Sequence, residues 1–217
     1  VKVYNIYREK RELKDPKKKL FGLILNGGLS RRMGSDKSKK MVSNKTLISL
    51  VVEKAKAQVD YLAINSNQKS SGNKIEIIPD CLSGNLGPLV GILSGLKWLE
   101  KSDDSFCNWL VIFPVDSPFF PENLVQCFFE NLRDEKIVMA KCKGRLHPVF
   151  SMWHTDNLKL LEKFLMEGGR KIDLFSKKIK TRVVNFPFIG YDPFFNVNNL
   201  DDLKIAEGIS SKLGGIN

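Results

Sequence analysis

Short apolar runs, bounded by glycine, proline and polar residues, recur along the 217-residue chain. Runs of this length without alternation are typical of strands that are buried on both faces of a parallel sheet. The pattern predicts strands over residues 20–25, 59–64, 74–78, 109–113, 137–140, 147–152 and 182–186. Because the run WLVIF at 109–113 is the most apolar, we expect it to lie near the centre of the sheet.

Between these runs, apolar residues recur at intervals of three and four, which is the period of an amphipathic helix. Glycine, proline and capping residues mark where these helices are expected to begin and end. Thr155 or Asp156 is the expected cap of one helix, Gly168 its expected end, and Asn199 the expected cap of the last helix. The predicted helices cover residues 46–58, 88–99, 121–132 and 158–165, and a further helix begins after residue 199.

The alternation of strands and helices predicts an α/β fold with three layers, in which helices cover both faces of a mostly parallel, twisted sheet. Sheets of this kind bind ligands beyond the carboxyl ends of their strands. We therefore expect the polar residues that follow four of the strands to meet at one crevice. These residues are 26–37, 65–67, Asp80 and Asp116.

Composition excludes several classes of protein. The chain is 42% hydrophobic and 27% charged, as in soluble globular proteins. It has no N-terminal apolar leader and no apolar run near the ~18 residues of a membrane span, so we expect a cytoplasmic protein without membrane contact. The four cysteines are irregularly spaced and there are only two histidines, which argues against a zinc site and for reduced thiols.

The chain is basic, with a formal net charge of +11. Residues 1–19 hold eight Lys and Arg and three Asp and Glu, so +5 of this charge lies in one short segment. We interpret residues 1–19 as a basic extension or linker and residues 20–217 as one domain. A basic surface favours an anionic partner, either nucleic acid or a polyphosphate. Aromatic residues are spread through the apolar runs, which argues against nucleic acid.

A loop rich in glycine and basic residues, LNGGLSRRMGSDK at 25–37, follows the first predicted strand. Gly27 and Gly28 permit positive φ and a close approach of the backbone to a ligand. Backbone N–H groups, together with Arg32 and Lys37, would form a site for a polyanion, although an ordinary turn with a solvated basic rim has the same composition. The spacing fits neither G-x-x-x-x-G-K-[ST] nor G-x-G-x-x-G.

Three further polar residues follow predicted strands. Asp116 comes after the most apolar strand, where a carboxylate is costly unless a cation such as Mg²⁺ balances it. Asp116 could instead cap the helix expected near Pro121. Asn65 and Asp80 follow short strands and could read a base, since a carboxylate accepts the N1–H and N2–H of guanine. Asp80 could also be a plain turn residue after Pro79.

The glycine loop resembles the L-A-G-G-x-S-x-R-M-G-x-D-K signature of nucleotidyltransferases, and most closely that of the molybdenum cofactor guanylyltransferase family (MobA family). Asn26 stands where that family usually has Ala. The resemblance covers roughly residues 20–212. It extends to segments INSN at 64–67, IPDCLSGNLGPLVG at 78–91, WLVIFPVDSPFF at 109–120, GRLHPV at 144–149, EGGRK at 167–171 and FFNVN at 194–198.

The resemblance implies a Rossmann-like nucleotidyltransferase fold and Mg²⁺-dependent transfer of GMP from GTP to molybdopterin, with release of pyrophosphate. It also implies contacts with a molybdoenzyme or a cofactor carrier. Arg32, Lys37 and Asp116 would be catalytic, and Asp116 would hold the metal. The implied acceptor residues are His147, Asn196 and Asn198, although His147 could equally be a core histidine. The implied nucleotide-binding residues are Leu25, Asn26, Gly27, Gly28, Lys37, Asn65, Asp80, Gly87 and Asp116.

Two other functions remain open at this point. A related nucleotidyltransferase would move CMP to molybdopterin, or a nucleotide to a sugar or polyol phosphate. A more distant alternative is a non-catalytic module that binds nucleic acid through its basic charge.

Overall fold

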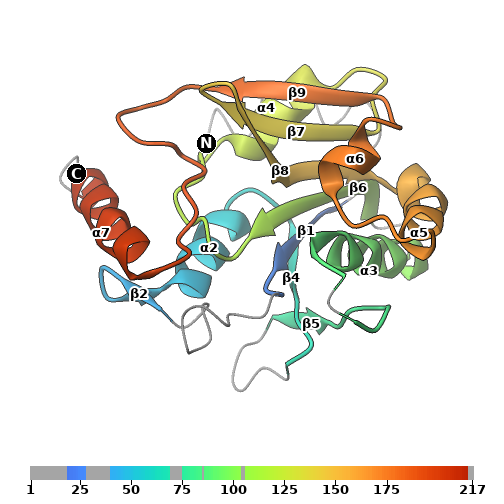
Figure 1. Cartoon of the computed structure of the whole chain (residues 1–217), viewed down its shortest axis with the longest axis horizontal. Coiled ribbons are helices and arrows are strands. Elements are labelled where there is room, and N and C mark those ends of the chain that lie inside the picture. The colour runs from blue at the N-terminus through green and yellow to red at the C-terminus, as the bar shows by residue number, and fades with distance from the viewer. Residues whose placement is uncertain (1–18, 28–39, 69–74, 85, 104–105, 215–217) are drawn as a thin grey trace.

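In the computed structural model of the chain, the described residues are 19–27, 40–68, 75–84, 86–103 and 106–214. Within them, seven strands form one sheet in the order β5-β4-β1-β6-β8-β7-β9 (Figure 1). The predicted central position of the strand at 109–113 is therefore confirmed. The strands are β1 (Lys19–Leu25), β4 (Tyr61–Asn65), β5 (Glu76–Ile78), β6 (Phe106–Pro114), β7 (Ile137–Cys142), β8 (Arg145–His154) and β9 (Thr181–Phe186).

The sheet is mostly parallel, as predicted. β1 pairs in parallel with β4 and β6, β4 with β5, and β7 with β9. β8 alone among these seven described strands runs the other way, antiparallel to both β6 and β7. Its first residues therefore lie at the edge where the other strands end. We call this edge the carboxyl edge of the sheet.

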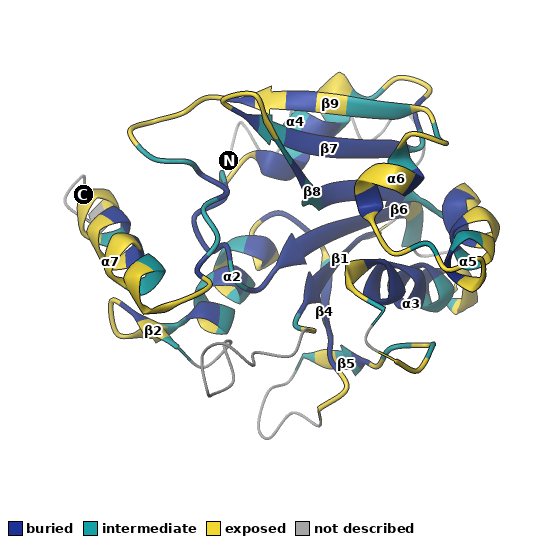
Figure 2. Ribbon diagram, viewed as in Figure 1, coloured by how far each residue is buried: buried dark blue, intermediate teal, exposed yellow. Residues whose placement is uncertain are grey.

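Helices cover both faces, which confirms the three-layer α/β prediction. α2 (Leu47–Lys56) and α4 (Leu124–Asn131) pack on one face, and α3 (Pro88–Lys101), α5 (Leu158–Met166) and α6 (Ile172–Ser176) pack on the other. Successive residues of a strand point to opposite faces, so Leu23 joins the core under α3, whereas Ile24 joins the core under α2. Figure 2 shows that most residues of β1 and β6 are buried, including the carboxyl ends of both strands.

The chain crosses back after β9 and ends in α7 (Leu200–Gly214), which lies beside the short hairpin of β2 (Met41–Val42) and β3 (Lys45–Thr46) (Figure 1). A third small core joins these elements through Val42, Val197 and Ala206. Asn199 Oδ1 accepts hydrogen bonds of 2.9 Å from the backbone N–H groups of Asp201 and Asp202, so the predicted cap of the last helix is confirmed.

Several predicted boundaries were wrong. Neither Thr155 nor Asp156 caps α5, because residues Thr155–Asn157 form a 3₁₀ turn and the His154 side chain accepts the backbone N–H of Asp156 at 3.2 Å. The helix expected from residue 121 begins at Leu124. The hairpin β2–β3 and the helix α6 were not predicted, because each is too short to show a period.

None of the helices described here is both long enough and apolar enough to span a membrane.

Candidate active site

Backbone hydrogen bonds join the strand ends along the carboxyl edge. The N–H of Asn26 donates to Asn65 O at 3.0 Å, just after β1 and β4 end. The N–H of Val115 donates to Leu25 O at 3.1 Å, and the N–H of Ser66 donates to Ile78 O at 3.1 Å. The residues that follow β1, β4, β5 and β6 and that the structure describes thus lie next to one another along this edge, whereas the crevice expected there stays a prediction.

A hydrogen-bonded network links the polar residues after β4 and β5. Asn65 is 3% exposed, and its amide donates to Asp80 Oδ1 at 2.9 Å and to Ile78 O at 3.0 Å. Asn67 donates to Asp80 Oδ2 at 2.9 Å and accepts the backbone N–H of Asp80 at 2.9 Å. Two amides therefore orient the Asp80 carboxylate, while each of its oxygens keeps a second acceptor position. This makes Asp80 more than a plain turn residue.

Gly91 on α3 makes room for this network. A Cβ at Gly91 would come closer than 3.0 Å to Asn65 Oδ1 and within 2.8 Å of Leu25 Cδ2. A side chain here would displace the amide that holds Asp80. Our site prediction omitted Gly91, although the spacing of GPLVG could have indicated it, because it places this glycine on the first turn of a helix that begins at the site.

The amino end of α3 also faces this region. Its N-cap, Gly87, has φ of 78°, a conformation that favours glycine, and a Cβ there would lie 3.7 Å from Arg170 O. The start of α3 therefore meets the segment EGGRK at 167–171. Since the first N–H groups of a helix have no partner within it, this end of α3 suits a phosphate or another anion.

Asp116 lies at the same edge, two residues after β6 ends. It is half-buried, its carbonyl accepts the N–H of Val197 at 2.8 Å, and Ser117 Oγ lies 3.4 Å from its carboxylate. The alternative role as a helix cap is excluded, because the N-cap of α4 is Asn123. A half-buried carboxylate is a ligand that fits Mg²⁺, which commonly takes one or two carboxylates from the protein. Among the described residues, no three His, Cys, Asp or Glu gather into a metal cage.

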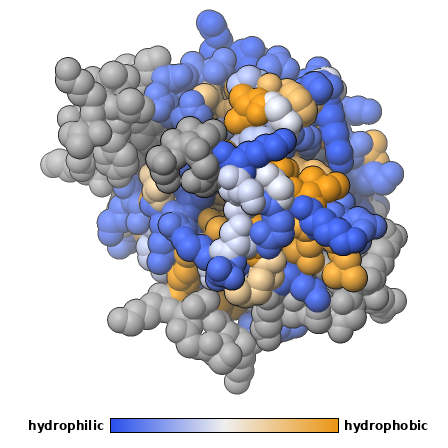
Figure 3. Space-filling model, turned by 90° about the vertical axis from the view of Figure 1, so that its left-hand side faces the viewer, coloured by the Kyte–Doolittle hydropathy of each residue, from blue (hydrophilic) through white to orange (hydrophobic). Residues whose placement is uncertain are grey.

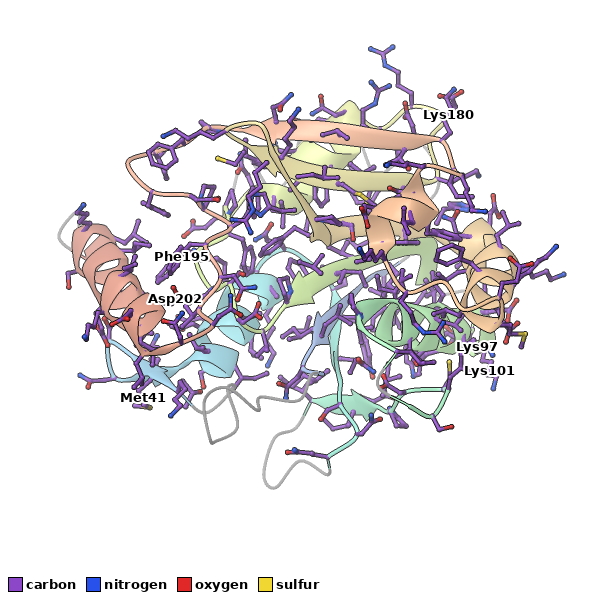
Figure 4. All side chains as sticks on the ribbon, viewed as in Figure 1. Met41, Lys97, Lys101, Lys180, Phe195 and Asp202 are labelled. Carbon is purple, nitrogen blue, oxygen red and sulfur yellow. The ribbon has the colours of Figure 1, made fainter. Side chains whose placement is uncertain are left out.

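The segment with Asn196 and Asn198 is tied to Asp116. Val197 is fully buried and bonds to the Asp116 carbonyl, whereas Asn196 is half-buried and Asn198 is exposed. The two asparagines therefore flank the residue that anchors them, in a segment without regular secondary structure. Asp202, labelled in Figure 4, accepts the N–H of Asn198 at 2.7 Å and fixes the far end.

His147 lies on β8, near the carboxyl edge but beneath its surface. Its side chain is 7% exposed, its Nε2 lies 3.5 Å from Asp192 Oδ2, and its ring centroid lies 4.8 Å from that of Phe194. Burial lowers the pKa of His147 below its ordinary value; Asp192 opposes this shift and Arg145 adds to it. The imidazole is therefore neutral at pH 7.

Gly28, Arg32 and Lys37 lie outside the described residues, so their predicted phosphate contacts stay a prediction. A cavity of about 780 Å³ lies elsewhere, between α2, α4 and α7, and none of the predicted site residues lines it. Apolar and polar side chains are mixed on the side of the molecule that carries α7 (Figure 3). The site is therefore assigned from the hydrogen-bonded residues of the carboxyl edge.

Comparison with known proteins identifies a matching family model and relatives that share one name. A family model described as the MobA-like NTP transferase domain matches residues 22–179. A molybdenum cofactor guanylyltransferase of Rhodopseudomonas palustris is 34% identical over 197 residues, which cover 88% of this chain and 92% of that protein. One from Mesorhizobium japonicum is 34% identical over 195 residues and covers 85% and 93% of the two chains.

Solved structures agree with the fold. The crystal structure of molybdopterin-guanine dinucleotide biosynthesis protein A from Archaeoglobus fulgidus matches with a TM-score of 0.71 and 25% identity, over 88% of this chain and 99% of that one. A 4-diphosphocytidyl-2C-methyl-D-erythritol synthase from Anaerococcus prevotii matches with a TM-score of 0.68 and 13% identity, over 90% and 97%. The second likeness concerns the fold alone.

Proposed function

The chain belongs to the MobA-like NTP transferase family, and we propose that it transfers GMP from GTP to molybdopterin, forming the guanine dinucleotide cofactor. The observation that carries this proposal is the set of side chains at the carboxyl edge. An oriented carboxylate, Asp80, and a half-buried carboxylate, Asp116, lie on strand ends that are hydrogen-bonded to one another. Relatives that share a third of the sequence over most of both lengths bear the name of this activity.

Asp80 accounts for the choice of base. The Watson–Crick edge of guanine presents two neighbouring donors, N1–H and N2–H, and a carboxylate can accept both. Cytosine presents one donor next to an acceptor, so one oxygen of Asp80 would face a lone pair. Asn65 and Asn67 each donate one amide N–H to the carboxylate and hold it in place, and Asn65 donates its other N–H to Ile78 O. The geometry therefore favours guanine over cytosine.

The transfer needs no nucleophile from the protein. An oxygen of the molybdopterin phosphate attacks the α-phosphorus of GTP, the bond from that phosphorus to the β-phosphate oxygen breaks, and pyrophosphate leaves. When bound, Mg²⁺ would neutralise phosphate charge in this step. Asp116 would hold it, Arg32 and Lys37 would stabilise the departing pyrophosphate, and Asn196 and Asn198 would bind the acceptor.

The test measures pyrophosphate release from GTP, CTP, UTP and ATP in turn, with molybdopterin and Mg²⁺ present. We expect release from GTP that depends on molybdopterin. Release from CTP instead would identify a cytidylyltransferase, and a requirement for a sugar or polyol phosphate in place of molybdopterin would identify the other related enzymes. A thermal-shift panel with the same four nucleotides gives an independent measure of base preference.

A further inference from the structure

His147 packs against the segment that carries the two asparagines, and Phe194 is the point of contact. Phe194 is 2% exposed, and its ring centroid lies 4.7 Å from that of Phe150 and 5.3 Å from that of Phe186. The His147 ring completes this cluster at 4.8 Å. Phe194 is thus an anchor that fixes the start of segment 194–198 in the core.

A second contact joins His147 to the same segment through Asp192. One carboxylate oxygen of Asp192 accepts the N–H of Phe194 at 2.9 Å, and its carbonyl accepts the N–H of Phe195 at 3.0 Å. The other carboxylate oxygen faces His147 Nε2 at 3.5 Å. Asp192 therefore shapes the turn with one oxygen and meets the histidine with the other.

The distance between His147 and Asp192 is informative. His147 Nε2 is buried, and among the described residues it forms no hydrogen bond. Nitrogen and oxygen atoms form hydrogen bonds at 2.7–3.2 Å, so the pair at 3.5 Å is an electrostatic contact and not a hydrogen bond. A buried polar atom without a partner is unfavourable, so a carboxylate that faces this nitrogen favours the placement of the Asp192 turn against β8.

Beyond Asn196, the same segment is held by Asp116. Val197 donates to the Asp116 carbonyl at 2.8 Å. Asn196 therefore lies between an anchor on β8 and an anchor next to the proposed metal ligand, so its position depends on both.

We propose that His147 is a positioning residue for the acceptor: it packs against Phe194 and faces Asp192, and thereby fixes Asn196 and Asn198 beside Asp116. What the asparagines bind rests on the proposed function, but the fixing of the segment does not. This role also explains why a polar residue is kept in an otherwise aromatic cluster.

The test compares three variants by amide hydrogen exchange. His147→Leu keeps apolar packing but removes the nitrogen, whereas His147→Gln keeps a donor. His154→Gln is the matched control, because His154 is the other histidine of the chain, ends the same strand and faces its own carboxylate, Asp156, at 3.1 Å. In His147→Leu we expect the N–H groups of Phe194, Phe195 and Val197 to exchange about five- to tenfold faster. Both glutamine variants should stay close to the wild type.

Asp192→Asn is a second variant in case His147→Leu does not fold. It keeps an oxygen for the N–H of Phe194 and removes the charge that faces His147, so exchange should rise at the same amides. Unchanged exchange in both variants would overturn the proposal. Faster exchange would support it even if the wild-type chain released no pyrophosphate from any nucleotide, a result that would overturn the proposed function instead.

Kinetics separate positioning from a general structural role. In His147→Leu, the KM for molybdopterin should rise about tenfold, since small misplacements of binding groups cost one to two orders of magnitude. The KM for GTP should stay within twofold of the wild type. An equal loss of affinity for both substrates would show a general structural role and would also overturn the proposal.

Discussion

Alanine variants of two aspartates, which lie at opposite edges of the sheet, can distinguish a metal-binding role from a general effect of charge. Asp116 follows β6 at the carboxyl edge, whereas Asp134 precedes β7 at the other edge and pairs on the surface with Lys180. We expect Asp116→Ala to lower the rate of pyrophosphate release by at least about a thousandfold, because a bound metal ion contributes several kcal/mol to transition-state stabilisation. Asp134→Ala should retain the wild-type rate.

A loss of activity in Asp116→Ala could also come from misfolding, and this is tested separately. Asp116 holds Val197 through its backbone carbonyl, and this hydrogen bond survives in the alanine variant. Circular dichroism and the melting temperature of Asp116→Ala should therefore stay close to those of the wild type. If a folded Asp116→Ala chain still transferred GMP, the metal role would be refuted.

A residue-scale prediction concerns pH. Burial lowers the pKa of His147 below its ordinary value of 6.5, so the unfolded chain binds more protons than the folded chain as the pH falls through that value. The free energy of unfolding should therefore decrease as the pH falls from about 7.5 to about 5, before the carboxylates titrate. His147→Gln should lose less stability over this range, as measured by urea unfolding. Its other histidine, His154, is unchanged, so the difference between the two chains isolates His147; identical pH profiles would contradict the assignment.

At the scale of elements, the apolar runs predicted the sheet well, because buried strands consist mainly of apolar residues and such runs can be located in the sequence. The start of the second strand was placed two residues early, since Val59 and Asp60 precede the strand and the Asp60 side chain accepts the N–H of Leu20 at 2.7 Å. This contact spans 40 residues, so no local pattern could indicate it. The failed cap prediction at Thr155 has a local cause, because the preceding side chain, His154, accepts the backbone N–H of Asp156.

The helix α3 allows a sharper test, because two of its glycines lie one turn apart against different neighbours. A Cβ at Gly91 would strike Asn65 and Leu25, whereas one at Gly95 would strike Leu23 and Leu110 at 2.7 and 2.8 Å. Both alanine variants should lose about 1–3 kcal/mol of stability through overpacking. Only Gly91→Ala should weaken GTP binding, by about tenfold, because the amide of Asn65 moves and no longer holds Asp80.

Isothermal titration with Mg-GTP and thermal unfolding measure the two effects on the same samples. Gly95→Ala is the matched control, since it costs stability without touching the network. If both variants weakened GTP binding equally, stability alone would explain the loss, and the role of Asn65 in orienting Asp80 would be wrong.

At the scale of the whole molecule, the sequence could place Asn65, Asp80 and Asp116 at one edge because parallel strands end together. It could not show that the turn at Asp192 meets β8, or that Val197 bonds to Asp116, since these contacts join segments more than 40 residues apart. The strand at 147–152 was predicted but its antiparallel direction was not, and it is this reversal that brings His147 to the carboxyl edge. The acceptor side of the site therefore depends on topology more than on local pattern.

The distribution of charge yields the last prediction. Of the +11 net charge, +5 lies in residues 1–19, whereas the residues assigned to GTP all lie beyond them. A chain that begins at Lys19, the first residue of β1, should release pyrophosphate from GTP at the rate of the full chain.

Any binding of RNA by the full chain should be weak, should fall steeply between about 50 and 200 mM salt, as contacts with phosphates do, and should be largely lost in the shorter chain. Fluorescence anisotropy with labelled RNA and the pyrophosphate assay measure the two properties on the same pair of proteins. Strong RNA binding that persists in the shorter chain, without an effect of Mg-GTP, would favour the nucleic-acid-binding alternative. If the shorter chain no longer transferred GMP, the extension and the domain would be a single functional unit, and the boundary at residue 19 would be wrong.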